Sequence, residues 1–167
     1  ANNCLHCGAC VEACPNGGKS CTACGQCIRA CPQGLRKLCG KRYTAQELAL
    51  KLLRDKDYLA AMSGGVTFSG GEPFCQAAAL YDLGSRLKAA GKHLMCYSGW
   101  TYEELADRAK TDRPTADLLS ILDVLVDGRF DISKRSLSLQ FRGSGNQRLI
   151  NVQQSLEQGC AVEYETL

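Results

Sequence analysis

Two runs of cysteine near the start of the chain carry the clearest chemical signal in the sequence. The chain has 167 residues, of which 12 are cysteine, and eight of these fall within the first 31 positions. Each run has the spacing C-x2-C-x2-C-x3-C-P, the first over residues 4–15 and the second over residues 21–32. Two-residue spacers let successive sulfurs cap adjacent corners of an iron–sulfur cube from one tight loop, and Gly8 and Gly25 ease that turn. The pattern therefore indicates iron–sulfur chemistry.

The doubled pattern matches the bacterial ferredoxin signature, in which three closely spaced thiolates hold one 4Fe-4S cube and the fourth cysteine crosses to the other cube. We therefore predict that residues 1–42 form a ferredoxin-like domain with two 4Fe-4S clusters. The ligands predicted for the first cluster are Cys4, Cys7, Cys10 and Cys31. The ligands predicted for the second cluster are Cys21, Cys24, Cys27 and Cys14. Because the segment lacks a periodicity long enough to bury a core, the clusters would supply its folding free energy.

Structural zinc and disulfides are the alternative explanations of these cysteines. Zinc sites use two C-x2-C pairs rather than two runs of three with a crossing fourth, and the absence of a secretion signal disfavours disulfides. Only six residues separate Cys14 from Cys21, a short connection that could strain or expose the second cluster. The remaining cysteines stand alone. Cys39 is expected to be a buried small residue or a spare thiol, and Cys75, Cys96 and Cys160 are expected to pack in the core of the α/β part.

The overall composition excludes several classes of protein. The net charge of +3, from 20 Lys and Arg against 17 Asp and Glu, is too small and too dispersed for nucleic-acid binding. The most apolar stretch, residues 118–126, is interrupted by Ser or Asp and falls short of the roughly 18 to 20 residues of a membrane span. We therefore expect a soluble, cytoplasmic protein that binds neither nucleic acid nor membrane.

From Thr44 onward, helix-like and strand-like stretches alternate. This order predicts an α/β fold whose mostly parallel sheet is covered by helices and is either open or curled toward a barrel. Thr44 with Glu47, and later Thr101, have the positions of helix caps. Helices are predicted over residues 45–62, 74–90, 102–110, 115–122 and 147–158, and strands over residues 66–68, 93–97, 124–126, 137–140 and 161–164. Functional loops are expected after the strands, at their carboxyl ends.

Several of these loops carry a family resemblance. The stretch Gly65-Val66-Thr67-Phe68-Ser69-Gly70-Gly71-Glu72-Pro73 resembles the GGEP element of radical S-adenosylmethionine (SAM) enzymes. A ferredoxin-like insert, a Tyr-Thr-x-x-Glu-Leu helix at residues 43–48 and then this strand is an order similar to that of the activating enzymes of glycyl-radical enzymes. Residues 97–105, 126–130 and 141–148 resemble the anaerobic ribonucleotide reductase activase branch, which is similar to pyruvate formate-lyase activase.

The resemblance implies a fold, an activity and partners. Residues 43–167 would form a partial (βα) radical SAM barrel that lacks its first strand. The complete enzyme would be a radical SAM oxidoreductase that cleaves SAM to methionine and a 5′-deoxyadenosyl radical, which abstracts hydrogen from a glycine of a partner glycyl-radical enzyme. A flavodoxin or ferredoxin-type reductant would supply electrons, and the two insert clusters would relay or hold them in an anaerobic cytoplasm.

The resemblance also implies a SAM pocket formed by Gly70, Gly71, Glu72, Pro73, Ser98 and Asp127. Glycines at a strand end let backbone groups approach a ligand closely, and Glu72 would accept from the methionyl ammonium. Asp127 matches the family's acidic residue near SAM, but the companion Asp is replaced by Cys96 or Tyr97, so the pattern of a cation site is incomplete.

Asn146 and Gln147 match the family's Ser-Asn-Gln element, with Gly145 in place of its second Ser. Ordinary structural roles are the alternatives to these functional ones. The Gly-Gly-Glu-Pro stretch could be a turn, Asp127-Gly128 is a common turn pair, and Asn146 could cap a helix.

One element of the family is missing from the sequence. Radical SAM chemistry needs a further 4Fe-4S cluster held by C-x3-C-x2-C, and the two candidate runs have Gly17 and Gly34 where the third cysteine is required. We therefore expect an N-terminally truncated chain, or else a split or degenerate relative, that does not cleave SAM by itself and that has a third cluster in the complete enzyme. The alternative function is a ferredoxin-type electron carrier fused to a non-catalytic α/β domain.

Overall fold

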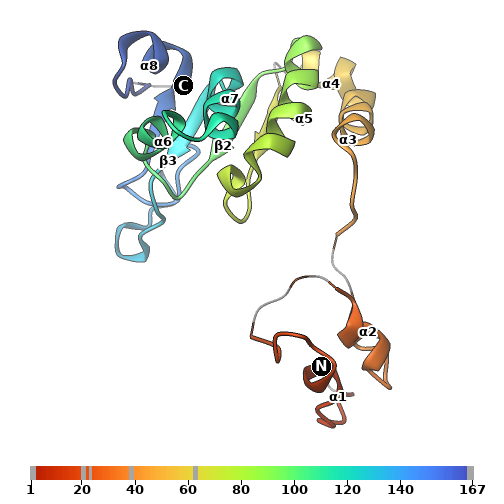
Figure 1. Cartoon of the computed structure of the whole chain (residues 1–167). Coiled ribbons are helices and arrows are strands. Elements are labelled where there is room, and N and C mark those ends of the chain that lie inside the picture. Colours follow the sequence, from red (N-terminus) through yellow and green to blue (C-terminus); the bar gives the residue numbers. More distant parts are fainter. Residues whose placement is uncertain (1–2, 20–21, 23, 38–39, 62–63, 165–167) are drawn as a thin grey trace. The chain divides into compact units, whose positions relative to one another are not determined.

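The computed structural model describes residues 3–19, 22, 24–37, 40–61 and 64–164, and Figure 1 shows the course of the chain. The chain divides into two compact units, residues 1–42 and residues 43–167, which are described separately below. In the described parts of both units, every helix is too short or too polar to cross a lipid bilayer.

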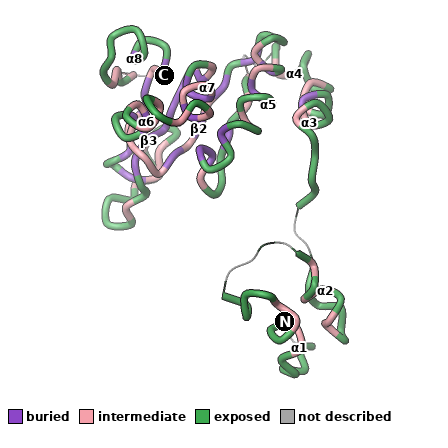
Figure 2. Tube along the Cα trace, in the orientation of Figure 1, coloured by how far each residue is buried: buried purple, intermediate pink, exposed green. Residues whose placement is uncertain are grey.

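The N-terminal unit contains two single-turn helices, α1 (Ala9–Glu12) and α2 (Gln26–Ala30). Each helix begins directly after a glycine in the left-handed conformation, Gly8 with φ 78° and Gly25 with φ 77°. Such a φ angle favours glycine, which has no Cβ to clash with the backbone. None of the described residues from 3 to 42 is buried, and Figure 2 shows the unit without buried segments. This unit therefore has no apolar core in its described part.

The second unit is an α/β structure built on a four-stranded mixed sheet. The strands are β1 (Val66–Phe68), β2 (Leu94–Tyr97), β3 (Val124–Asp127) and β4 (Arg148–Asn151), and they lie in that order. Strands β1, β2 and β3 are parallel, whereas β4 runs antiparallel to β3. The predicted α/β class is confirmed, and the sheet is mostly parallel as predicted, with β4 as its antiparallel strand.

The first predicted helix is interrupted. Helix α3 (Ala45–Leu52) begins with the predicted capping box between Thr44 and Glu47. A 3-10 turn, η1 (Leu53–Asp55), then separates it from α4 (Lys56–Ala61), so the prediction of one continuous helix is wrong. The helix is interrupted where its contact with the core ends, because residues 54–58 are all exposed and none of their side chains packs on the core.

The next three helices lie close to their predicted positions. Helix α5 (Ala77–Ala89) follows a 3-10 turn, η2 (Pro73–Gln76), and α6 (Tyr102–Ala109) has a capping box formed by Thr101 and Glu104. Helix α7 (Arg113–Ile121) begins two residues before its predicted start, because the Asp112 carboxylate accepts a hydrogen bond from the Thr115 amide.

The end of the chain differs most from the sequence prediction. Residues 137–140 form no strand, and residues 148–151 form strand β4 rather than the first turn of a helix. Leu149 and Ile150 are buried against β3, whereas Leu137 is 90% exposed, so burial selects the later segment. Helix α8 (Val152–Gln158) is capped by Asn151, and the predicted last strand is reduced to a single bridge between Ile150 and Glu163.

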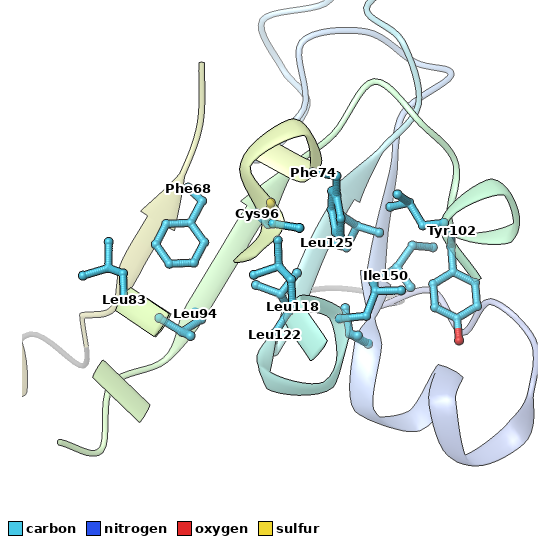
Figure 3. Close-up of a cluster of buried hydrophobic side chains, with 14 of the residues drawn as sticks. Phe68, Phe74, Leu83, Leu94, Cys96, Tyr102, Leu118, Leu122, Leu125 and Ile150 are labelled. Carbon is cyan, nitrogen blue, oxygen red and sulfur yellow. The ribbon is translucent and has the colours of Figure 1, made fainter. Parts of the chain in front are cut away.

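Helices α5, α6 and α7 contribute to a core on one face of the sheet (Figure 3). The strand side chains in this core are Phe68, Leu94, Cys96, Leu125 and Ile150. A smaller cluster on the other face contains Val124, Val126 and Leu149, with Tyr164 packed against it.

The three single cysteines in this unit have different environments. Cys96 is fully buried, as predicted, and desolvation together with the nearby Glu72 charge raises the pKa of its thiol to about 12. Cys75 and Cys160 are exposed, so the prediction that they pack in the core is wrong. Cys75 lies in the 3-10 turn η2, and Cys160 follows Gly159, where the chain leaves α8. Cys39 lies outside the described residues.

Candidate functional site

Four cysteines from two separate stretches line one cavity in the N-terminal unit. The cavity has a volume of about 510 Å³, and its cysteines are Cys4, Cys7, Cys10 and Cys31. They are the four residues predicted to hold the first cluster, and Cys31 comes from beyond α2 to join the first run. Among the described residues, no group of three or more His, Cys, Asp or Glu side chains is arranged to hold a metal ion as it stands. The ligand assignment therefore remains a prediction.

Hydrogen-bond donors face two of these sulfurs. The Leu35 amide donates to Cys31 Sγ at 3.4 Å, and this and neighbouring backbone amides lower the pKa of the Cys31 thiol. The Arg36 guanidinium donates from Nη2 to Cys10 Sγ at 3.5 Å, which raises the pKa of Arg36. The amide donors at Cys31 favour its thiolate form, which is the form that binds metal. Arg36 is not among the residues predicted from the sequence, although a cation shortly after a crossing cysteine is a signal that could have identified it.

The second predicted set is described only in part. Cys14 and Cys27 are half-buried and Cys24 is exposed, while Cys21 lies outside the described residues. The assignment of these four cysteines to a second cluster therefore stays a prediction.

The carboxyl ends of the parallel strands β1, β2 and β3 lie at one edge of the sheet. Directly after β1, Gly70 and Gly71 have φ angles of 89° and 63°. A Cβ atom built on either residue meets nothing within 4 Å. Backbone conformation rather than crowding therefore requires glycine here, and open space remains beside the loop.

Glu72 connects this loop to the loop after β2. Its Oε1 accepts from Ser98 Oγ at 3.0 Å, and its Oε2 accepts from the Gly99 amide at 2.8 Å. Glu72 Oε1 also accepts from the Phe74 amide at 3.2 Å, where Pro73 starts the 3-10 turn η2. The structure thus brings Glu72 and Ser98 of the predicted pocket into direct contact.

Asp127, at the end of β3, has a different set of partners. Its side chain is 1% exposed and accepts from Arg148 Nε at 3.1 Å, from Arg148 Nη2 at 2.5 Å and from the Tyr102 amide at 2.7 Å. Arg148 also donates to both Glu103 oxygens, at 3.1 and 2.7 Å. This double pairing raises the pKa of Arg148, and the Arg148 hydrogen bond lowers the pKa of Glu103 to about 2. The Asp127 carboxylate is therefore held by protein groups.

Arg148 is not among the site residues predicted from the sequence. The antiparallel register places Arg148 opposite Asp127. The pair could be predicted from the sequence only if strand β4 were recognised first, and the sequence pattern of residues 148–151 instead predicts the start of a helix.

Asn146 and Gln147 shape the loop between β3 and β4. Gln147 Oε1 accepts from the amides of Gly143 and Ser144 at 2.8 and 3.2 Å, and its Nε2 donates to the Gly128 carbonyl at 3.1 Å. Asn146 Nδ2 donates to the Arg129 carbonyl at 2.7 Å. Asn146 does not cap a helix, because α8 begins later, so that alternative is wrong.

Comparison with known proteins gives matches over most of the chain. A family described as a 4Fe-4S single cluster domain matches residues 3–150. The anaerobic ribonucleoside-triphosphate reductase-activating protein of Vibrio cholerae is 35% identical over 112 residues, which cover 65% of this chain and 68% of that protein. Its counterpart from Pasteurella multocida is 32% identical over 106 residues, which cover 61% of this chain and 65% of that protein.

A further relative is the pyruvate formate-lyase-activating enzyme of Clostridium pasteurianum, which is 44% identical over 70 residues. This match covers 40% of the chain and 29% of that enzyme. The matched segments thus span about two thirds of the reductase-activating proteins and less than one third of the pyruvate formate-lyase-activating enzyme.

Proposed function

The chain belongs to the 4Fe-4S single cluster domain family and to the activating enzymes of glycyl-radical enzymes, and from this premise we propose that it serves to generate a glycyl radical on a partner enzyme by radical SAM chemistry. The family match supports iron–sulfur binding over zinc or disulfides. The relatives also favour this function over a ferredoxin-type carrier with a non-catalytic α/β domain.

We propose two 4Fe-4S clusters in a ferredoxin-like domain of residues 1–42. The observation that carries the proposal is the shared cavity of Cys4, Cys7, Cys10 and Cys31, because it unites a run of three thiols with the crossing fourth. Cys14, Cys21, Cys24 and Cys27 are the ligands proposed for the second cluster. Amide and guanidinium donors at Cys31 and Cys10 suit the negative charge of cluster thiolates.

We further propose that residues 43–167 are part of a radical SAM barrel with its cofactor pocket at the carboxyl edge of the sheet. The backbone of Gly70 and Gly71 has open space beside it that the ligand would occupy, and Pro73 would stabilise the 3-10 turn that follows. Glu72 would accept from the SAM ammonium, with Ser98 beside it. Asp127 would act at the rim through Arg148 and the start of α6 rather than as a free carboxylate.

The missing cluster motif limits what the present sequence does alone. A reduced 4Fe-4S cluster with an open iron supplies the electron that cleaves SAM, and the 167 residues contain no C-x3-C-x2-C run to hold one. We therefore expect these residues to bind SAM without cleaving it. The proposed partners are a glycyl-radical enzyme and a flavodoxin or ferredoxin-type reductant in an anaerobic cytoplasm.

The test uses the chain purified and reconstituted without oxygen. Iron and sulfide analysis should give about eight iron atoms per chain if both clusters form, and equilibrium dialysis should detect SAM binding that Glu72→Ala weakens by about ten-fold or more. Glu157→Ala, an exposed glutamate on α8, is the matched control and should bind SAM normally. Iron-free protein, or a chain with no SAM affinity, would contradict the proposal. Catalytic formation of 5′-deoxyadenosine by these residues alone would contradict the expected inactivity.

A further inference from the structure

Glu72 lies at the junction of two loops that come from different strands. Its carboxylate holds its own loop through the Phe74 amide and holds the loop after β2 through Ser98 Oγ and the Gly99 amide. An ionised carboxylate has about four acceptor positions. Three of the positions on Glu72 are filled by protein donors, two on Oε1 and one on Oε2.

The hydrogen bonds continue from Glu72 to the third loop. Ser98 Oγ, which donates to Glu72, also accepts from the Trp100 amide at 3.0 Å. The Trp100 carbonyl in turn accepts from the Gly128 amide at 3.2 Å, directly after β3. A continuous hydrogen-bonded path therefore joins the loops after β1, β2 and β3.

The surroundings strengthen these bonds. Ser98 is 5% exposed and Phe74 is 1% exposed, so water competes poorly for the polar groups that link them. The guanidinium carbon of Arg108 lies 4.4 Å from the centroid of the Trp100 ring, and this cation–π contact also restrains the loop after β2. Backbone amides that lose an acceptor in such a setting are costly to leave unpaired.

We propose that Glu72 is a positioning residue that fixes the loops after β1 and β2 relative to each other before any cofactor binds. Its remaining acceptor position, on Oε2, is the position left for an ammonium group, a second role that rests on the proposed function. Glu72 thus does more than contact a ligand, because the pocket takes its shape from this carboxylate. Ser98 carries the restraint onward to Trp100.

Amide hydrogen exchange in the cofactor-free full chain tests the positioning role. A glutamine at position 72 has one carbonyl oxygen, so it can serve Gly99 or Phe74 but not both, since they bind different oxygens. Glu72→Gln should therefore speed exchange at one of these two amides by about ten-fold or more. The Ser98 amide, which donates to the Val126 carbonyl at 2.9 Å, is the internal reference and should not change.

A second variant separates the two branches of the path. Ser98→Ala should speed exchange at the Trp100 amide, which loses its hydroxyl acceptor, while the Gly99 amide keeps Glu72 and stays protected. Unchanged exchange at both Gly99 and Phe74 in Glu72→Gln would overturn the proposal. If Glu72→Gln unfolds the unit as a whole, Ser98→Ala decides, and equal acceleration at Gly99 and Trp100 would also overturn it.

SAM affinity tests whether the positioning matters for the cofactor. If Glu72 and Ser98 act through their shared hydrogen bond, the double variant should lose less affinity than the sum of the single losses. Additive losses would refute the coupling. A wild-type chain that fails to bind SAM would contradict the proposed function but not the positioning role. The positioning role is tested separately, by hydrogen exchange in the cofactor-free chain.

Discussion

The N-terminal unit and the α/β unit depend on different sources of stability. No described residue of the first unit is buried, whereas the second has a core that includes fully buried Leu118, Leu125 and Ile150. Apolar burial contributes about 1.5–3 kcal/mol for each such side chain, and the described residues of the first unit make no comparable contribution. Four of its cysteines instead line a cavity, with hydrogen-bond donors at Cys31 and Cys10.

Because their sources of stability differ, we expect the two units to unfold independently. A unit without a core depends on its ligand, because metal-binding free energy replaces the missing apolar burial. A unit with a core depends on the fit of its side chains. For each unit we therefore expect a perturbation that destabilises that unit and leaves the other one folded.

Removal of iron has the largest expected effect. Chelation under anaerobic conditions should open the N-terminal unit to trypsin at its Lys and Arg positions, such as Arg29 and Arg36, while the α/β unit remains resistant. Limited proteolysis with mass spectrometry of the fragments measures this, and iron-loaded protein is the control. Equal resistance of the first unit with and without iron would show that its stability does not depend on bound iron.

A cavity in the core should give the reverse result. Leu118→Ala, on α7, should lower the free energy of unfolding of the α/β unit by about 2–5 kcal/mol and leave the iron content unchanged. Leu137→Ala is the matched control, since Leu137 is 90% exposed and its loss should cost less than about 0.5 kcal/mol. Denaturation followed by fluorescence reports on this unit, because Trp100 is the only tryptophan in the sequence. Iron loss in Leu118→Ala would contradict the independence of the units.

Breaking the Arg148 pairs should have a smaller but clear effect. Arg148→Met leaves the buried Asp127 carboxylate with the Tyr102 amide as its remaining hydrogen-bond partner. We expect a loss of about 1.5–3 kcal/mol of unfolding free energy, because the removed hydrogen bonds involve charged groups. Asp127→Asn in the same background should recover part of the loss by removing the unpaired charge. No difference between the single and double variants would contradict the role of Arg148 as the partner of Asp127.

The smallest effect concerns pH. The pKa of Glu103 in the folded chain is lowered from 4.5 to about 2, chiefly by Arg148, so its pairing stabilises the fold above pH 4.5 and is lost as pH falls toward 2. The Glu103 side chain is 58% exposed, and solvent screening limits the contribution to about 1 kcal/mol or less.

Unfolding measured between pH 2 and pH 6 on iron-free protein should therefore show a slope in wild type that Glu103→Gln reduces. Iron-free protein is used because bound iron and sulfide would otherwise add their own response to acid. Identical slopes in the two proteins would rule out this contribution.

The sequence alone determined the features that depend on neighbouring residues. Cysteine spacing, the capping box of Thr44 with Glu47 and the three parallel strands all follow from local patterns, which are set by chain geometry over a few positions. The α/β class followed from the alternation of those elements. Local patterns failed where tertiary burial selected between segments, as when Leu149 and Ile150 formed β4 in place of residues 137–140.

The contacts between side chains that are distant in the sequence depend on the folded chain. The contact of Glu72 with Ser98 joins loops 26 residues apart, and the pairing of Asp127 with Arg148 depends on the register of an antiparallel strand. The contact of Arg36 with Cys10 likewise joins separate stretches of the N-terminal unit. A hydrogen bond requires a separation of about 3 Å and a suitable angle, and residues distant in sequence reach that geometry only through the packing and strand register of the folded chain.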